Sequence, residues 1–67
     1  MTLAQKIKTK REAVGMSREE LAERVGCCVG TIYQWEEGRR KPRHRHFVKI
    51  IDALDIGMIE FFREVDE

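Results

Sequence analysis

The sequence predicts an all-α protein: a bundle of five short helices in a single domain that spans residues 1–67. Hydrophobic residues recur at spacings of three and four along most of the chain, and glycines separate these periodic segments. No segment of useful length shows the alternation of apolar and polar residues that is typical of a strand. With 67 residues, 42 % of them hydrophobic and 37 % charged, the composition fits one small globular domain.

The first helix is expected to begin almost at the N-terminus. Thr2 and Gln5 have the spacing of a capping box, in which each residue's side chain bonds the other's backbone amide. Leu3, Ile7 and Val14 lie on one apolar stripe, and the glycine that follows is expected to end the helix.

The central stretch predicts two helices joined by a tight turn. Ser17 can cap the first of them, and Glu20 completes a second capping box. Gly26 is expected to close this helix in the left-handed conformation. A second periodic run begins after Cys28 and stops at Gly38. Helix, glycine turn and helix together form the arrangement in which the second helix can enter the major groove of DNA.

Two more helices are expected to complete the bundle, one from about His44 to Leu54 and a short one after Gly57. The central pair and the fourth helix share the apolar positions of the predicted core, which are Leu21, Ala22, Val25, Ile32, Trp35, Phe47, Ile50, Ile51 and Leu54.

Charge is segregated along the chain although the net charge is only +1. Residues 38–49 contain no acid and hold Arg39, Arg40, Lys41, Arg43, Arg45 and Lys49. A second basic set near the N-terminus consists of Lys6, Lys8, Lys10 and Arg11. Residues 50–67 carry six acids against Arg63 alone. This distribution predicts one basic and one acidic face, and a basic face suits a polyanionic partner.

Several classes of protein are disfavoured by what the sequence lacks. No apolar run approaches the roughly 20 residues of a membrane span, and no signal-peptide pattern opens the chain, so a cytoplasmic protein is expected. No nucleophile–base pair or phosphate-cradling glycine motif indicates an enzyme or a cofactor. Cys27 and Cys28 are adjacent and lack CxxC spacing, so reduced thiols are expected and no metal site.

Four segments of the chain together resemble a known family. In chain order they are residues 17–26, 31–38, 40–42 and 49–54. Their sequences and spacing resemble the Cro and lambda-repressor type of helix-turn-helix protein, also called the xenobiotic-response-element family. The opening Ile7-Lys-Thr-Lys-Arg11 is similar to small lambdoid phage repressors. The resemblance extends from Leu3 to about Phe62 and implies a five-helix bundle that binds operator DNA, usually as a two-fold dimer.

The same resemblance implies which residues meet DNA. Base contacts are expected from the outer side of the second central helix, at Val29, Gly30, Thr31, Tyr33 and Gln34. Phosphate contacts are expected from Ser17, Arg18, Cys28, Arg39, Arg40, Lys41 and Arg43. Arg11 and Glu36 match a structural ion pair, and the expected dimer interface contains Ile56, Met58, Ile59 and Phe62.

The predicted function is a transcriptional regulator that binds double-stranded DNA, most simply a repressor bound as a homodimer to a palindromic operator. Two alternatives stay open: an antitoxin with the same fold, and a protein-interaction module that has lost DNA binding. Val29 and Gly30 favour the module, because relatives more often place polar side chains there, whereas the arginines at 39–43 oppose it. Controller proteins of restriction–modification systems share this size and fold, and the sequence does not separate them from phage repressors.

Overall fold

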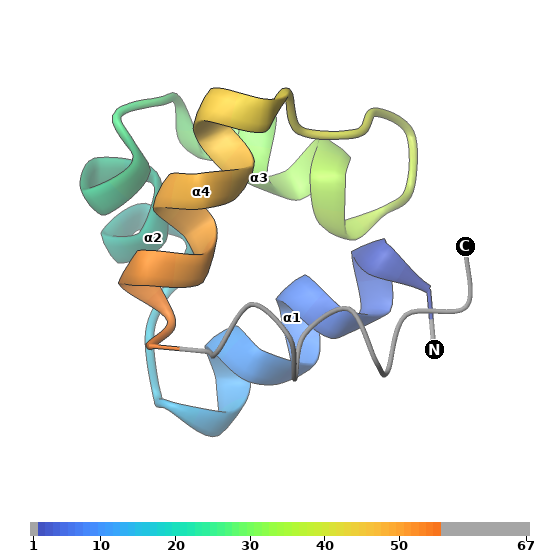
Figure 1. Ribbon diagram of the computed structural model, residues 1–67. Helices are drawn as coiled ribbons and strands as arrows, with labels where there is room; N and C mark the ends of the chain where they lie inside the picture. The colour runs from blue at the N-terminus through green and yellow to red at the C-terminus, as the bar shows by residue number, and fades with distance from the viewer. Residues whose placement is uncertain (1, 56–67) are drawn as a thin grey trace.

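The computed structural model describes residues 2–55. Its helices are α1 (Leu3–Ala13), α2 (Arg18–Val25), α3 (Val29–Glu36) and α4 (His44–Ala53), and this part of the chain contains no strand. In Figure 1, α2, α3 and α4 gather around a shared centre and α1 lies below them. α2 packs against both α3 and α4, and α1 packs against α3. The all-α prediction and the order of the first four helices are confirmed.

The predicted fifth helix lies outside the described residues. The same is true of the predicted dimer-interface residues, which are Ile56, Met58, Ile59 and Phe62. None of the helices in residues 2–55 has the length and hydrophobicity that a membrane span requires.

Side-chain caps and a glycine define the ends of the first helices. At the start of α2, the Ser17 hydroxyl accepts a hydrogen bond from the Glu20 amide at 3.1 Å, and the Ser17 amide donates to the Glu20 carboxylate at 3.3 Å. Thr2 and Gln5 form the same reciprocal pair at the start of α1. Gly26 ends α2 with a φ of +85°, in the left-handed region that favours glycine. Both predicted capping boxes and the glycine stop are confirmed.

The hydrophobic core lies where the four helices meet. The buried apolar residues are Ile7, Leu21, Ala22, Val25, Ile32, Trp35, Ile50, Ile51 and Leu54. Phe47 and Met16 are partly buried and pack against this cluster. The core predicted from the periodicity is therefore confirmed, with Phe47 at its edge.

Two expectations for the N-terminal segment are wrong. Val14 is 52 % exposed, because α1 ends at Ala13 and Val14 lies in the cap beyond the apolar stripe. The N-terminal basic residues do not all belong to an exposed face, because Lys6 is only 1 % exposed; Arg11 is also buried, as the expected ion pair with Glu36 requires. These two side chains lie on the inward side of α1, as Ile7 does.

Candidate nucleic-acid interface

α3 has a buried side and an open side. Ile32, Trp35 and Glu36 are buried and hold the helix against the rest of the bundle. On the open side, Val29 is 42 % exposed and Tyr33, one turn later, is 44 % exposed. α3 therefore presents an outward surface that a large partner can reach.

The remaining residues of the predicted base-contacting set lie on or beside this open side. Gly30 is exposed, whereas Thr31 and Gln34 are half-buried at its edges. A Cβ atom built on Gly30 meets no other atom within 4 Å. The fold thus leaves open space at Gly30, and no neighbour among the described residues requires a glycine there.

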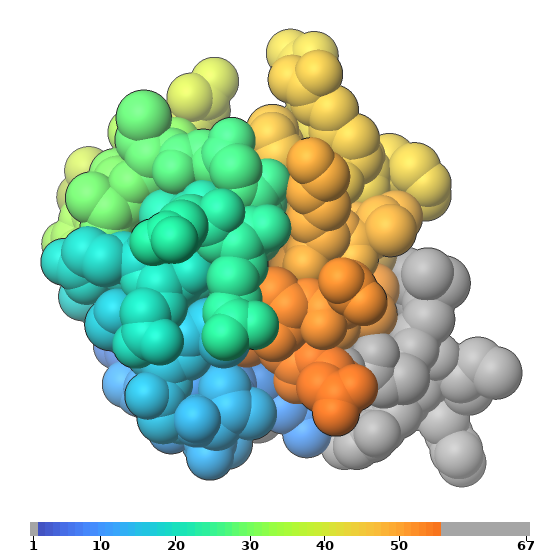
Figure 2. All heavy atoms as spheres, turned by 90° about the vertical axis from the view of Figure 1, so that its left-hand side faces the viewer, coloured from blue at the N-terminus to red at the C-terminus, as the bar shows by residue number. Residues whose placement is uncertain are grey.

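A basic cleft of about 350 Å³ lies between α3 and the start of α4. Its lining residues are Thr31, Trp35, Arg40, Lys41, Arg43, Arg45 and His46. Figure 2 shows a notch near its top, between the green-to-yellow atoms of α3 and the following loop and the yellow atoms of the first turn of α4. Four cations around one recess create a local positive potential, which favours an anion such as a phosphate group.

Backbone hydrogen bonds attach the basic loop to the end of α3. The amides of Arg39 and Arg40 both donate to the carbonyl oxygen of Gln34, at 3.0 and 3.4 Å. Gly38 permits this reversal with a φ of +75°. The loop cations are therefore held next to the last turn of α3.

Trp35 and His46 connect the two walls of the basic cleft. Their ring centroids are 5.4 Å apart and the rings are inclined by 47°. Trp35 comes from the buried side of α3, and His46 comes from the first turn of α4. Trp35 is only 3 % exposed, so its predicted place in the core is confirmed.

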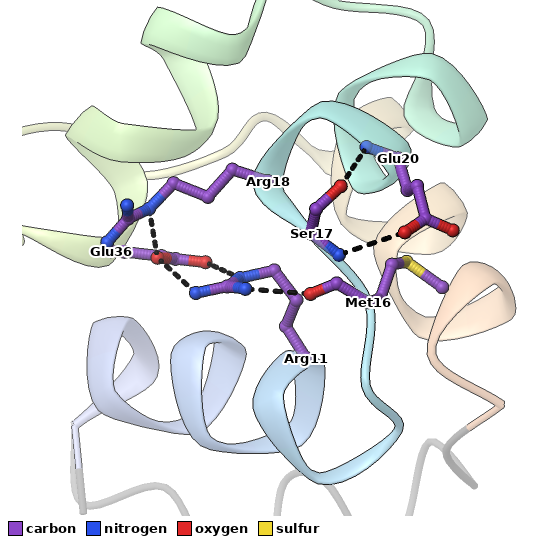
Figure 3. A network of polar contacts seen from close by, with 6 residues as sticks. All are labelled: Arg11, Met16, Ser17, Arg18, Glu20 and Glu36. Atoms are coloured by element: carbon purple, nitrogen blue, oxygen red, sulfur yellow. Dashed lines mark hydrogen bonds and ion pairs between the residues drawn. The ribbon is translucent and has the colours of Figure 1, made fainter.

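An ion-pair network joins α1, α2 and α3 (Figure 3). Arg11 Nε donates to Glu36 Oε2 at 2.6 Å, and Arg11 Nη2 donates to Glu36 Oε1 at 3.3 Å. Arg11 Nη1 also donates to the carbonyl oxygen of Met16 at 2.7 Å. The hydrogen bond with Glu36 raises the pKa of the Arg11 guanidinium, against a smaller opposing effect of burial. The structure thus places the two residues of the expected ion pair in direct contact.

Arg18 is a third member of this network that sequence reasoning missed. Its Nε donates to Glu36 Oε1 at 3.0 Å, so the buried carboxylate is bound by two guanidinium groups. Arg18 Cζ also lies 5.4 Å from the centroid of the Tyr33 ring. No local pattern in the sequence signals these contacts, because they join α2 to α3.

The structure gathers only some of the expected phosphate-contacting residues. Arg40, Lys41 and Arg43 line the basic cleft, whereas Arg39 is exposed outside its lining. Ser17 and Cys28 are exposed N-cap residues of α2 and α3. Sequence reasoning missed two further lining residues, Arg45 and His46. Their presence in the acid-free stretch 38–49 was the available signal.

The two cysteines occupy the turn between α2 and α3 as free thiols. Cys28 is exposed, and Cys27 is half-buried against the core. Burial raises the pKa of the Cys27 thiol, with a smaller contribution from Cys28. Cys28 makes no side-chain capping bond to α3, in keeping with the poor acceptor strength of sulfur. Among residues 2–55, no group of three or more His, Cys, Asp or Glu side chains could hold a metal ion.

Known proteins resemble this chain along most of its length. The helix-turn-helix family model HTH_3 matches residues 7–61. The transcriptional repressor RstR of the cryptic phage CTXphi, from Vibrio cholerae serotype O1, is 27 % identical over 60 residues, which are 90 % of this chain and 54 % of RstR. The chain therefore spans about half the length of this curated relative.

Two solved structures have the same fold. The restriction-modification controller protein C.AhdI from Aeromonas hydrophila is 32 % identical with a TM-score of 0.83, and the match covers 90 % of this chain and 91 % of C.AhdI. A point mutant of the restriction-modification controller protein C.Esp1396I is 24 % identical with a TM-score of 0.84, covering 91 % of this chain and 79 % of the mutant chain.

Proposed function

Because the chain belongs to the Cro/C1-type helix-turn-helix family of DNA-binding regulators, we propose that it is a repressor that recognises a specific double-stranded DNA sequence through the open side of α3. Proteins of this family are generally not enzymes.

One observation carries the proposal: the open side of α3 lies next to the basic cleft. Thr31, at the edge of the open side of α3, lines the same recess as the cations Arg40, Lys41 and Arg43 of the loop before α4. A helix that enters the major groove has a strand backbone on either side of it, so cations beside the helix can bind phosphates. The two features thus have the relative placement that this mode of binding requires.

Different parts of this surface perform different tasks in the proposed complex. Gln34 hydrogen-bonds adenine through its two-sided amide, and Val29 contacts a thymine methyl group. The basic cleft binds a phosphate, which positions the helix without reading sequence. Gly30 allows the backbone of α3 to approach the base edges closely.

A two-fold dimer is the second part of the proposal. α3 has only eight residues, so one copy offers few base-reading side chains. Two copies related by a two-fold axis place their recognition helices about 34 Å apart and read a palindrome with half-sites one DNA turn apart. The proposed interface residues Ile56, Met58, Ile59 and Phe62 lie outside the described residues.

Binding-site selection from random duplex DNA tests the proposed function directly. We expect enrichment of one palindromic sequence whose half-sites are one helical turn apart. Enrichment of a single half-site contradicts the dimer but keeps the recognition surface. Retention of all sequences equally contradicts specific recognition.

The likeness to C.AhdI favours a narrower candidate, a controller protein of a restriction–modification system. C.AhdI is 32 % identical to this chain, against 27 % for the phage repressor RstR. A restriction endonuclease gene and a methyltransferase gene beside the coding sequence would support this role. If the selected operator lies instead within a prophage, the controller role is contradicted and the repressor role is retained.

A further inference from the structure

We infer that Arg18 is a positioning residue that holds the Tyr33 ring against the DNA and so contributes to sequence preference at the base pairs that Tyr33 meets. This inference rests on the proposed function, because it assigns a task within the same surface. It concerns the part of the ion-pair network that extends from the core to the open side of α3.

The Arg18 guanidinium is fixed at its inner end. Its Nε donates to Glu36 Oε1 at 3.0 Å, and the Glu36 side chain is 0 % exposed. Glu36 is held in turn by Arg11, which also bonds the carbonyl oxygen of Met16. Figure 3 shows Glu36 between the two guanidinium groups. A buried carboxylate with two charge-assisted bonds is a rigid anchor for Arg18.

The outer part of the same guanidinium reaches Tyr33. Arg18 Cζ is 5.4 Å from the ring centroid, within the roughly 6 Å over which a cation and an aromatic face attract each other. The Arg18 side chain is 35 % exposed, and Tyr33 is the exposed aromatic residue of α3. An exposed tyrosine on a helix can otherwise occupy several rotamers. Contact with the anchored guanidinium favours one of them before DNA arrives, which lowers the ordering cost of binding.

The ring that Arg18 orients lies among the side chains that face DNA in the proposed complex. Tyr33 is one turn beyond Val29 on the open side of α3 and directly precedes Gln34. A tyrosine there offers an apolar ring edge and a hydroxyl that can both donate and accept. Its orientation therefore determines which base edge it meets.

The effect of Arg18 on DNA binding depends on whether it orients Tyr33 or only contacts a phosphate. A cation that binds only phosphate raises affinity for every sequence to the same extent. A residue that orients a base-reading side chain changes the ratio between sequences. Arg18 can do both, but only the second role makes its effect depend on Tyr33.

The test compares R18M, Y33L and the double variant R18M/Y33L on the selected duplex and on duplexes with single base-pair changes. We expect R18M and Y33L to lower discrimination at the same base pairs. The double variant should lose no more than Y33L alone, with a coupling of about two- to fivefold in the ratio of dissociation constants. The matched control is R24M, which removes an exposed arginine from the same helix and should leave the ratios unchanged.

Three results overturn the inference: R18M weakens all duplexes equally, R18M only lowers the melting temperature, or its effect is independent of Tyr33. If R18M does not fold, R18K replaces it, because a single compact ammonium group bound to the Glu36 carboxylate cannot also lie over the Tyr33 ring. R18K should then reduce the same ratios. If the wild-type chain selects no sequence, the proposed function fails and this inference fails with it; selection with unchanged ratios overturns the inference alone.

Discussion

Arg11 and Glu36 lie 25 residues apart in the sequence, and their side chains meet at 2.6 Å inside the fold. One guanidinium from α1 thereby joins the last residue of α3, while the same group bonds the Met16 carbonyl in the connection to α2. α3 is thus held by an ionic contact with α1 as well as by the burial of Ile32 and Trp35. The contact therefore links α1 directly to the C-terminal end of α3.

Removing Glu36 should destabilise the protein more than removing Arg11. E36A leaves Arg11 buried without its carboxylate, and we expect a loss of about 3 kcal/mol in the free energy of unfolding. R11M should cost less, because Arg18 still binds Glu36. The apolar double variant R11M/E36L should recover much of the loss, since no buried charge remains unpaired. Urea denaturation measures all three, and a double variant as unstable as E36A contradicts this account.

Neutralising the basic cleft should weaken DNA binding without changing its specificity. Arg40 and Lys41 both line the cleft, and R40A/K41A removes two charges proposed to bind phosphate. We expect lower affinity for all duplexes and a log–log salt slope reduced by about 2 if each cation neutralises one phosphate. Fluorescence anisotropy at several salt concentrations measures both quantities.

The matched control for the cleft is R24A/K49A, which removes two exposed charges from outside the cleft lining. This control should reduce affinity much less, because only general attraction is lost. Equal losses in both variants would show that the cleft has no special role. Unchanged binding in R40A/K41A would favour a protein-interaction module over a DNA-binding regulator.

Local features of the fold could be predicted from the sequence because they depend on residues close together in the chain. The Ser17–Glu20 capping box, the Gly26 stop and the apolar face of α4 each involve one turn or two of helix. The prediction for Val14 is wrong because a helix end that shifts by one residue moves a side chain off the stripe.

Contacts between side chains on different helices depend on how the helices cross, and no local sequence pattern predicts that crossing. The pairing of Arg11 with Glu36 was expected only through a family resemblance. The contacts of Arg18 with Glu36 and of His46 with Trp35 were not expected, because each joins residues on different helices. The basic stretch was visible in the sequence, but its division between cleft-lining residues and the outlying Arg39 was not.

The two cysteines should differ in reactivity although they are neighbours. Cys28 is exposed, whereas Cys27 is half-buried and burial raises the pKa of its thiol. In single-thiol variants, Cys28 of C27S should react faster with a disulfide reagent at about pH 7.5 than Cys27 of C28S. The two rates should converge in denaturant. Equal rates in the folded variants would contradict the burial of Cys27.

The same pKa shift implies a pH dependence of stability. A thiol with a raised pKa in the folded state holds its proton more tightly there than in the unfolded chain. Its contribution to stability is complete below the ordinary thiol range and is lost as pH rises through the folded-state pKa, so the effect begins above about pH 8.5. Urea midpoints should fall over this range in the wild-type chain and fall less in C27A. An equal fall in both would assign the dependence to other groups.

Substitution of Gly30 should have opposite effects on the stability of the protein and on its affinity for DNA. A Cβ atom at this position meets nothing within 4 Å, and Gly30 lies inside α3, where alanine favours the helix by up to about 1 kcal/mol. G30A should therefore raise the melting temperature. It should also weaken DNA binding, because a methyl group would occupy space proposed for the approach of α3 to the base edges.

A matched control for G30A is a second alanine substitution on the open side of the same helix. Y33A removes a ring from that side, adds no bulk and leaves the backbone of α3 free to approach. G30A should lose affinity for every duplex, including non-specific ones bound in the groove, whereas Y33A should lose discrimination at particular base pairs. If G30A is more stable and binds DNA as tightly as the wild-type chain, the glycine has no role in close approach and α3 lies further from the bases than proposed.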